Sequence, residues 1–334
     1  MSTIEFVERN GRLAGDLLRA AMAARSAPSI FNSQPWRWRI VSAGAELRAD
    51  RQRQLTAIDP AGRLLLVSCG AALHHARTAL DGAGFVHEVD LLPDPSDPDL
   101  LARLRVGGQG FPAPAAVRRY QAIALRRTDR RPFAEVDVPD DALDGLRAAA
   151  EEQGAHLHVL RPDETVRLAV LAGAAAAAEY TDPAYRHTLA EWTARPAGAG
   201  DGVPVDTAGE MVPRPVPVRD YTPGAPVLTL NAVADRHARY AVLFTDGDSP
   251  ADWLTGGEAL SAVLLAATME WLAVSPMSDV TEVPAIREHL RGLLGGIGYP
   301  VVVLRIGVPE RAGRPPASPR RPAHETVEVV RPDR

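Results

Sequence analysis

The sequence predicts an α+β protein in which a unit of helices and mostly antiparallel strands occurs twice. One observation is that helical spacing of apolar residues alternates with short strand-like segments in two successive cycles. Another is an internal repeat, in which Gly70-Ala71-Ala72-Leu73 resembles Gly257-Glu258-Ala259-Leu260 and each follows an apolar run, 64–67 or 240–244. Small residues at these points would let the two helices pack closely together. A chain of 334 residues is long enough for two such units.

The first cycle is expected within residues 1–115. It begins with a helix, continues through two strands that pair as a hairpin, and returns through a helix to a further strand. The predicted elements are the helix 5–25, the strands 36–41 and 46–50, the helix 64–80 and the strand 86–92. Trp36 to Val41 alternates large apolar residues with Arg, which is typical of a half-buried strand. We expect a loop at 107–110, because its glycines lack the context of a dinucleotide-binding motif.

The second cycle is expected within residues 116–334. Its predicted helices cover 118–127, 139–153, 162–192, 253–274 and 283–294, and its predicted strands cover 157–160, 239–244 and 300–306. Asp140 or Asp141 would cap the second of these helices, and Gly154 would end it. Residues 194–226 are rich in Pro and Gly, and a loop of this length is either functional or disordered.

Composition excludes several kinds of function. The formal net charge of −5 gives no reason to expect nucleic acid as a partner. All 37 basic residues are Arg, so the chain has no lysine for a Schiff base, and any phosphate must be held by Arg or by backbone N–H groups. The single cysteine, Cys69, excludes intrachain disulfides and cysteine-based zinc sites. Without a signal-like N-terminus or an apolar run near the ~20 residues that cross a bilayer, we expect a cytoplasmic protein.

Two motifs carry chemistry. The first is Pro28-Ser29-Ile30-Phe31-Asn32-Ser33-Gln34-Pro35-Trp36, which offers a hydroxyl and two amides that both donate and accept hydrogen bonds. Taken alone, these residues favour an ordinary polar loop that leads into an edge strand. The second is Arg126-Arg127-Thr128-Asp129-Arg130-Arg131-Pro132-Phe133, either a solvated basic face or an anion site. Thr128 and Pro132 favour a defined turn.

Together these motifs resemble the flavin mononucleotide (FMN) site of the nitroreductase family, and specifically its Acg-like branch, in which two nitroreductase-like halves are fused. The resemblance implies a duplicated nitroreductase-like fold, a single-chain pseudo-dimer that works as a monomer, and one complete FMN site. It also implies a lid within the insertion at about 181–226. Phe133 comes one residue later than in the family pattern, which leaves open whether Arg130 or Arg131 faces the cofactor.

The resemblance also implies the residues of the FMN site. They lie in the two motifs, in the segment after the long helix and in a basic pair near the C-terminus. The implied set is Pro28, Ser29, Asn32, Gln34, Arg126, Arg127, Thr128, Arg130, Met277, Ser278, Arg320 and Arg321. Within it, Asn32 and Gln34 would tune the flavin ring, while Arg126, Arg127, Arg320 and Arg321 would hold the phosphate.

Three functions remain open from the sequence. The leading one is an FMN-dependent oxidoreductase that transfers hydride through flavin N5, with NAD(P)H as a candidate donor and a nitro compound, a quinone or a peptide-derived ring as substrate. The second is a non-catalytic protein that sequesters FMN under a closed lid. The third is a scaffold that has lost the flavin. No catalytic side chain is predicted, and no metal site, because His74-His75 and His156-x-His158 lack partners at metal spacing.

Overall fold

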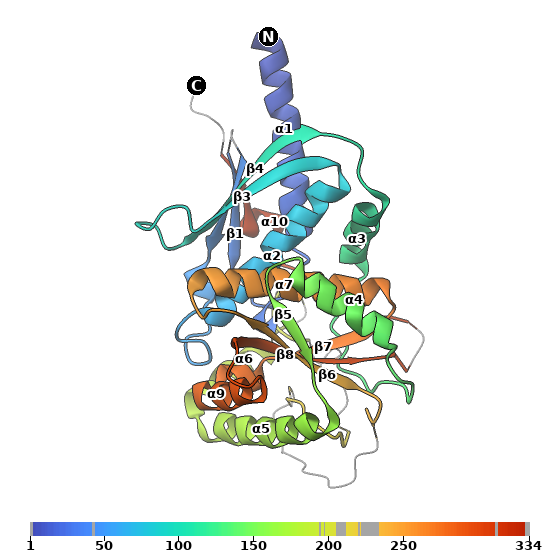
Figure 1. Cartoon of the computed structure of the whole chain (residues 1–334). Helices are drawn as coiled ribbons and strands as arrows, with labels where there is room; N and C mark the ends of the chain where they lie inside the picture. Colours follow the sequence, from blue (N-terminus) through green and yellow to red (C-terminus); the bar gives the residue numbers. More distant parts are fainter. Residues whose placement is uncertain are drawn as a thin grey trace.

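The structure, a computed structural model, describes residues 3–41, 44–193, 195–196, 198–204, 212–219, 221, 234–310 and 313–330, with side chains from Leu13 onward. It contains two β-sheets, each flanked by helices, and one pair of crossing helices between them (Figure 1). The predicted α+β class is confirmed, and both sheets are mostly antiparallel as expected.

The first sheet has the strand order β3-β4-β2-β1-β9. Its strands are β1 (Trp36–Val41), β2 (Gly44–Ala49), β3 (Phe85–Leu91), β4 (Leu100–Gln109) and β9 (Val327–Val329). Only the β1–β9 pair is parallel. Along β1, Trp36, Trp38 and Ile40 are buried while the arginines between them face outward, as the period of two requires. These residues pack against helices α1 (Thr3–Ala24) and α2 (Arg63–Gly82), which cover this sheet.

The second sheet has the order β5-β6-β8-β7 and is covered on both faces. Its strands are β5 (His156–Val159), β6 (Arg239–Thr245), β7 (Ala273–Met277) and β8 (Tyr299–Gly307). The helices α4 (Asp140–Glu151) and α7 (Pro250–Met269) lie on one face, and α5 (Pro162–Thr181) and α9 (Pro284–Leu293) lie on the other. Because β8 is central and has no solvent face, nearly every residue along it is buried, which explains its continuous apolar run. The remaining helices are the short η1 (Ile30–Asn32) and η2 (Arg51–Arg53), together with α3 (Pro114–Leu125), α6 (Pro183–Thr193), α8 (Asp279–Glu282) and α10 (Ala323–Thr326).

Helices α2 and α7 cross at the two glycines of the internal repeat. A Cβ atom at Gly70 would lie 2.0 Å from the carbonyl oxygen of Leu254, and one at Gly257 would lie 2.0 Å from that of Val67. Each glycine therefore faces the residue three positions before the other glycine. Only glycine allows the two backbones to approach this closely.

Several predicted elements differ from the structure. Residues 107–109 end β4 and do not form a loop, whereas the apolar run 64–67 belongs to helix α2, within the predicted helix 64–80. Strand β4 escapes the sequence pattern because it includes two arginines and two glycines, and its pairing with β2 and β3 defines it instead. Strand β9, with only three residues, is defined in the same way by its pairing with β1.

The long helix predicted to reach residue 274 ends at Met269. Trp271 adopts a left-handed φ of 59°, which turns the chain so that Ala273–Met277 forms strand β7. The helical stretch 162–192 is two helices, because Pro183 starts α6 where α5 ends. Pro139 is the N-cap of α4, rather than Asp140 or Asp141, while Gly154 follows this helix with the expected positive φ of 77°.

The predicted insertion at about 181–226 lies partly outside the described residues, Met211 included. Its described parts are packed against the body of the protein. Val216 is fully buried beside α5 and α9, and Val203 lies in a cluster with Phe31 and Trp192.

Candidate functional site

The first motif forms a tight turn with unusual backbone geometry. Phe31, Asn32 and Gln34 have φ values of 45°, 54° and 49°, in the left-handed region that residues other than glycine rarely adopt. The side chain of Ser29 accepts a hydrogen bond from the Gln34 N–H at 2.9 Å, and that of Ser68 accepts one from the Ile30 N–H at 3.1 Å. Such strain costs on the order of 1–3 kcal/mol per residue and clusters at functional sites.

Three distant segments meet at a cavity beside this turn, which we call the cationic cavity. It encloses about 350 Å³ of space, part of it open to solvent. Its lining comes from the first motif, the second motif, the C-terminal basic pair and the insertion, and comprises Pro28, Ser29, Asn32, Arg126, Thr128, Arg130, Gly202, Val203, Pro204, Ser318 and Arg320. The structure therefore brings together seven of the twelve residues that the resemblance implied.

Two buried arginines give this cavity its charge. Burial, followed by repulsion from Arg127, lowers the pKa of Arg126 to about 10, and its Nε and Nη1 atoms have no hydrogen-bond partner in the described part of the chain. Burial, followed by repulsion from Arg126, Arg127 and Arg25, lowers the pKa of Arg320 to about 9. Within the residues that the structure describes, neither guanidinium has an acidic partner. A buried cation without a counter-charge is costly, so an anion bound here would relieve that cost.

Arg320 also holds the cavity together. Its Nη1 donates to Oδ1 of Asn32 at 2.6 Å and its Nη2 donates to the carbonyl oxygen of Ser26 at 2.8 Å. The Asn32 amide nitrogen in turn donates to the carbonyl oxygen of Pro319 at 3.0 Å. These bonds connect the first motif to the C-terminal segment.

Three of the implied residues do not line the cavity. The Gln34 amide nitrogen donates to the carbonyl oxygens of Gly200 and Asn32, and its oxygen accepts from the backbone N–H of Arg321, so its amide faces the protein interior. The Arg321 guanidinium donates to the Gln34 carbonyl oxygen at 3.0 Å and pairs with Glu325 at 3.2 Å. The Arg127 guanidinium donates to the backbone oxygens of Ala124 and Arg126.

Arg130 and Arg131 have different surroundings in the structure. Nε and Nη2 of Arg131 donate to the Asp129 carboxylate, at 2.9 and 2.6 Å, and Nη2 also donates to the carbonyl oxygen of Gly313 at 3.1 Å. Arg130 lines the cationic cavity and also a second cavity next to it. Arg130 is therefore the one of the two that faces the site.

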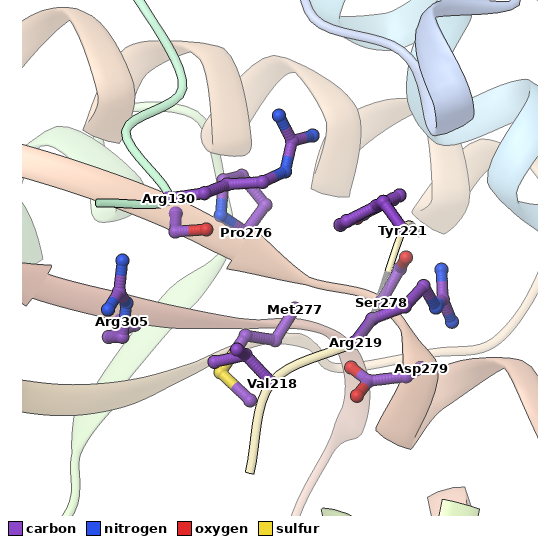
Figure 2. A pocket seen from close by; sticks show the side chains of 10 residues that line it. Arg130, Val218, Arg219, Tyr221, Pro276, Met277, Ser278, Asp279 and Arg305 are labelled. Atoms are coloured by element: carbon purple, nitrogen blue, oxygen red, sulfur yellow. The ribbon is translucent and has the colours of Figure 1, made fainter. Parts of the chain in front are cut away.

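The second cavity, which we call the inner cavity, lies at the end of β7 and also encloses about 350 Å³, partly open to solvent (Figure 2). It contains the remaining two implied residues, Met277 and Ser278. The full lining is Arg130, Val218, Arg219, Tyr221, Ser275, Pro276, Met277, Ser278, Asp279 and Arg305. The Arg130 guanidinium lies over the Tyr221 ring, 4.6 Å from its centre.

Sequence reasoning missed Arg219, Tyr221, Asp279 and Arg305. A signal existed for Arg305, because a lone charge inside a fully apolar strand implies a buried partner. That partner is Asp235, which also pairs with Arg214 at 2.7 Å. No comparable pattern marks Arg219, whereas Asp279 directly follows Met277 and Ser278, which the resemblance implied.

A buried polar network closes one side of the inner cavity. Arg219 pairs with Glu179 and with Glu282, each at 2.7 Å, and the Tyr185 hydroxyl donates to Glu282 at 2.5 Å. Asp279 lies in the same region, and its pKa is raised to about 7, first by burial and then by the charges of Glu179 and Glu282.

Residues 198–204 of the insertion cover part of the cationic cavity. Asp201 forms an ion pair with Arg53, and the Gly200 carbonyl oxygen accepts a hydrogen bond from the Gln34 amide at 2.8 Å. The Val203 N–H donates to the carbonyl oxygen of Trp192 at 2.9 Å. These contacts hold the segment against the first motif.

The described part of the chain contains no group of three or more His, Cys, Asp or Glu side chains that could hold a metal ion. His74 and His75 are buried and both hydrogen-bond to the Ser261 hydroxyl, at 2.8 and 2.9 Å. Among the described helices, none is long and apolar enough to cross a membrane.

Comparison with solved structures finds distant similarities. A Desulfitobacterium hafniense nitroreductase with bound FMN has 16% identity and a TM-score of 0.41, covering 64% of this chain and 98% of that chain. The FMN-dependent nitroreductase NfnB from Mycobacterium smegmatis, in complex with NADPH, has 18% identity and a TM-score of 0.40, covering 65% of this chain and 100% of that chain. No model of a protein family matches the chain.

Full-length relatives are much more similar in sequence. The Mycobacterium tuberculosis protein named "Putative NAD(P)H nitroreductase acg" is 34% identical over 319 residues, covering 94% of this chain and 96% of its own length. A second M. tuberculosis protein, "Putative NAD(P)H nitroreductase Rv3131", is 36% identical over 306 residues, covering 90% and 88%. Identity at this level over nearly the whole length shows that the chain belongs to the nitroreductase superfamily, in the Acg-like family.

Proposed function

We propose that this protein is an FMN-binding oxidoreductase of the nitroreductase type, with its complete site inside one chain. The observation that carries the proposal is the pair of buried arginines, Arg126 and Arg320, with no acidic partner among the described residues. A phosphate monoester would supply the missing negative charge and accept the unsatisfied N–H groups of Arg126.

The two cavities fit the two ends of FMN. The cationic cavity would hold the phosphate and the ribityl chain through Ser29, Asn32, Thr128 and the two arginines. The inner cavity, with Met277, Ser278 and Arg130, would hold the ring and leave room for a substrate. The flavin supplies reversible hydride transfer at N5, so the protein's tasks are binding, orientation and access. NAD(P)H is the proposed donor, because the relatives' names include it.

The reciprocal crossing of α2 and α7 supports a duplicated fold. Gly70 and Gly257 approach the opposite helix in equivalent ways, as related helices would at a pseudo-two-fold axis. We therefore propose that residues 1–115 and 116–334 are two nitroreductase-like halves and that the chain functions as a monomer. Since the first motif and the arginine motif each occur once, the chain would bind one FMN.

A specific observation also favours the alternative, FMN sequestration without turnover. Residues 198–204 are held over the cationic cavity by the Arg53–Asp201 ion pair and by the Gln34–Gly200 hydrogen bond. A segment held in this way would act as a closed lid and restrict access to the flavin.

An absorbance spectrum of the purified protein, with FMN supplied and then with NADPH added under anaerobic conditions, tests both candidates. A flavin band that NADPH bleaches supports the oxidoreductase. A band that resists NADPH but bleaches with dithionite supports sequestration. A protein that takes up no FMN contradicts the proposal.

A further inference from the structure

Asp279 is the carboxylate that lines the inner cavity. It is the first residue of helix α8, directly after Ser278, and lies beside Arg219 in Figure 2. Its side chain is nearly buried, with 5% of the residue exposed. A carboxyl in this position meets whatever enters the cavity and is otherwise shielded from bulk water.

Burial favours the protonated form of Asp279, and the carboxylates of Glu179 and Glu282 add to this effect, while Arg219 opposes it. Arg219 already pairs with two carboxylates, Glu179 on α5 and Glu282 on α8. Within the described residues, no ion pair joins Asp279 to any cation. Three carboxyl groups therefore share one guanidinium in a buried region, and the one without a direct partner is the one that keeps a proton.

We propose, on the basis of the proposed function, that Asp279 is the proton donor to a substrate that is reduced in the inner cavity. It lies at the end of β7, next to the residues expected at the flavin ring. Transfer of a hydride alone to a carbonyl substrate leaves an oxyanion. A reduction therefore also requires a proton donor, and a carboxyl group at the cavity wall can supply that proton.

The step balances for a quinone. Reduced FMN would supply one hydride, which is two electrons together with one proton, and the quinone that accepts it would gain one C–OH in place of C=O as its ring becomes aromatic. The second oxygen then carries a negative charge, and Asp279 transfers its proton to it. The products are the hydroquinone, oxidised FMN and an Asp279 carboxylate, which regains a proton from solvent.

The pH dependence follows from the groups that surround this carboxyl. Glu179 on α5, Glu282 on α8 and Tyr185 on α6 belong to its network, and Arg219 is the nearby cation. Arg287 on α9 donates to the Thr281 carbonyl, and Arg305 on β8 lines the same cavity, paired with Asp235. With the pKa of Asp279 raised to about 7, the donor is present below this pH and is lost above it.

The experiment measures the protonation of the Asp279 carboxyl independently of the flavin reaction. Infrared spectroscopy of wild type and Asp279→Asn, across the pH range around 7, reports the protonated carboxyl without any turnover. Stopped-flow mixing of dithionite-reduced, FMN-loaded protein with benzoquinone then reports the oxidative half-reaction. We expect a carboxyl band that disappears near pH 7 in wild type only, and a half-reaction that is about a hundred-fold slower in Asp279→Asn and no longer depends on pH.

Glu179→Gln is the matched variant. It removes a negative charge near Asp279 but leaves Arg219 paired with Glu282, so the infrared and kinetic midpoints should move together to lower pH. An Asp279 carboxyl that is ionised throughout, or an unchanged rate and pH profile in Asp279→Asn with FMN bound, overturns this inference alone. A wild-type protein that does not bind FMN overturns the proposed function and this inference together.

Discussion

Replacing Arg126 by Met should stabilise the protein without FMN and weaken FMN binding. The Arg126 guanidinium is buried, lacks an acidic partner among the described residues and has two N–H groups without acceptors. The pKa of Arg126, lowered from the ordinary value of an arginine to about 10, corresponds to about 3 kcal/mol, at ~1.36 kcal/mol per pH unit, by which folding disfavours the charged form. Because the pKa of this cation is lowered, the cost is present in full below about pH 10 and disappears only as the pH rises to the pKa of an arginine in the unfolded chain.

The expected magnitudes follow from this cost. Met fills much of the same space without a charge, so the free energy of unfolding of the apoprotein should rise by about 1–3 kcal/mol. The phosphate would lose charge-assisted hydrogen bonds worth roughly 1.5–3 kcal/mol each, so the Kd for FMN should rise at least about tenfold. Urea unfolding with and without FMN, together with a fluorescence titration of FMN, measures both effects.

Arg321→Met is the matched control. The Arg321 guanidinium donates to the Gln34 carbonyl oxygen and pairs with Glu325. Its loss should therefore destabilise the apoprotein by roughly 1–3 kcal/mol, an effect opposite in sign to that of Arg126→Met. An Arg126→Met variant that is less stable than wild type and binds FMN equally well would refute the assignment of this arginine to an anion site.

Three further predictions concern other parts of the molecule. Gly257→Ala should destabilise the protein by at least about 2 kcal/mol in chemical denaturation, because its Cβ would meet a backbone carbonyl oxygen. The control Gly145→Ala, at an exposed helical position with open space, should stabilise the protein by about 0.5–1 kcal/mol. Equal effects at both sites would contradict the close crossing of α2 and α7. Asp201→Asn removes the ion pair with Arg53 and should speed FMN dissociation, measured by dilution into apoflavodoxin, and an unchanged rate would mean that residues 198–204 do not limit escape. Cys69 is buried, with its pKa raised by burial, so a thiol reagent should label it only in denaturant; rapid labelling of the native protein would show that this part of the core opens.

The elements that the sequence predicts well are those in which burial follows a simple period. Strand β1 alternates because one face is buried, and β8 is continuously apolar because both faces are covered. Strand β4 was missed, since its arginines and glycines have no strand preference of their own and become a strand only by pairing with β2 and β3. The turn to β7 depends on the left-handed Trp271, which no local signal marks.

In the candidate site, too, the sequence predicts some features and not others. Motifs identify the segments that meet, and Ser29, Asn32, Arg126, Thr128 and Arg320 do line one cavity. What sequence cannot provide is which of two adjacent side chains faces inward, because that depends on which acceptors lie nearby.

The pairs of neighbouring arginines illustrate this limit. Arg131 is turned away by Asp129, and Arg321 by Gln34 and Glu325, whereas Arg130 and Arg320 face the cavities. Asp279 ends the segment that the resemblance singled out after the long helix, but its proton depends on the burial of three carboxyl groups that come from two helices, which the sequence does not show.

The crossing of α2 and α7 within one polypeptide has a consequence for evolution and for assembly. Segments that meet within one polypeptide associate in a unimolecular step. Dilution therefore cannot separate them, whereas it can separate the subunits of a dimer. The two sides of the crossing are also encoded separately, so a mutation here changes one side only. The residues next to the glycines differ: Ala71 follows Gly70 and is fully buried, while Glu258 follows Gly257 and pairs with Arg77. Under the proposed duplication, this separate encoding would let one half specialise in holding a ligand while the other retains the shape that supports it.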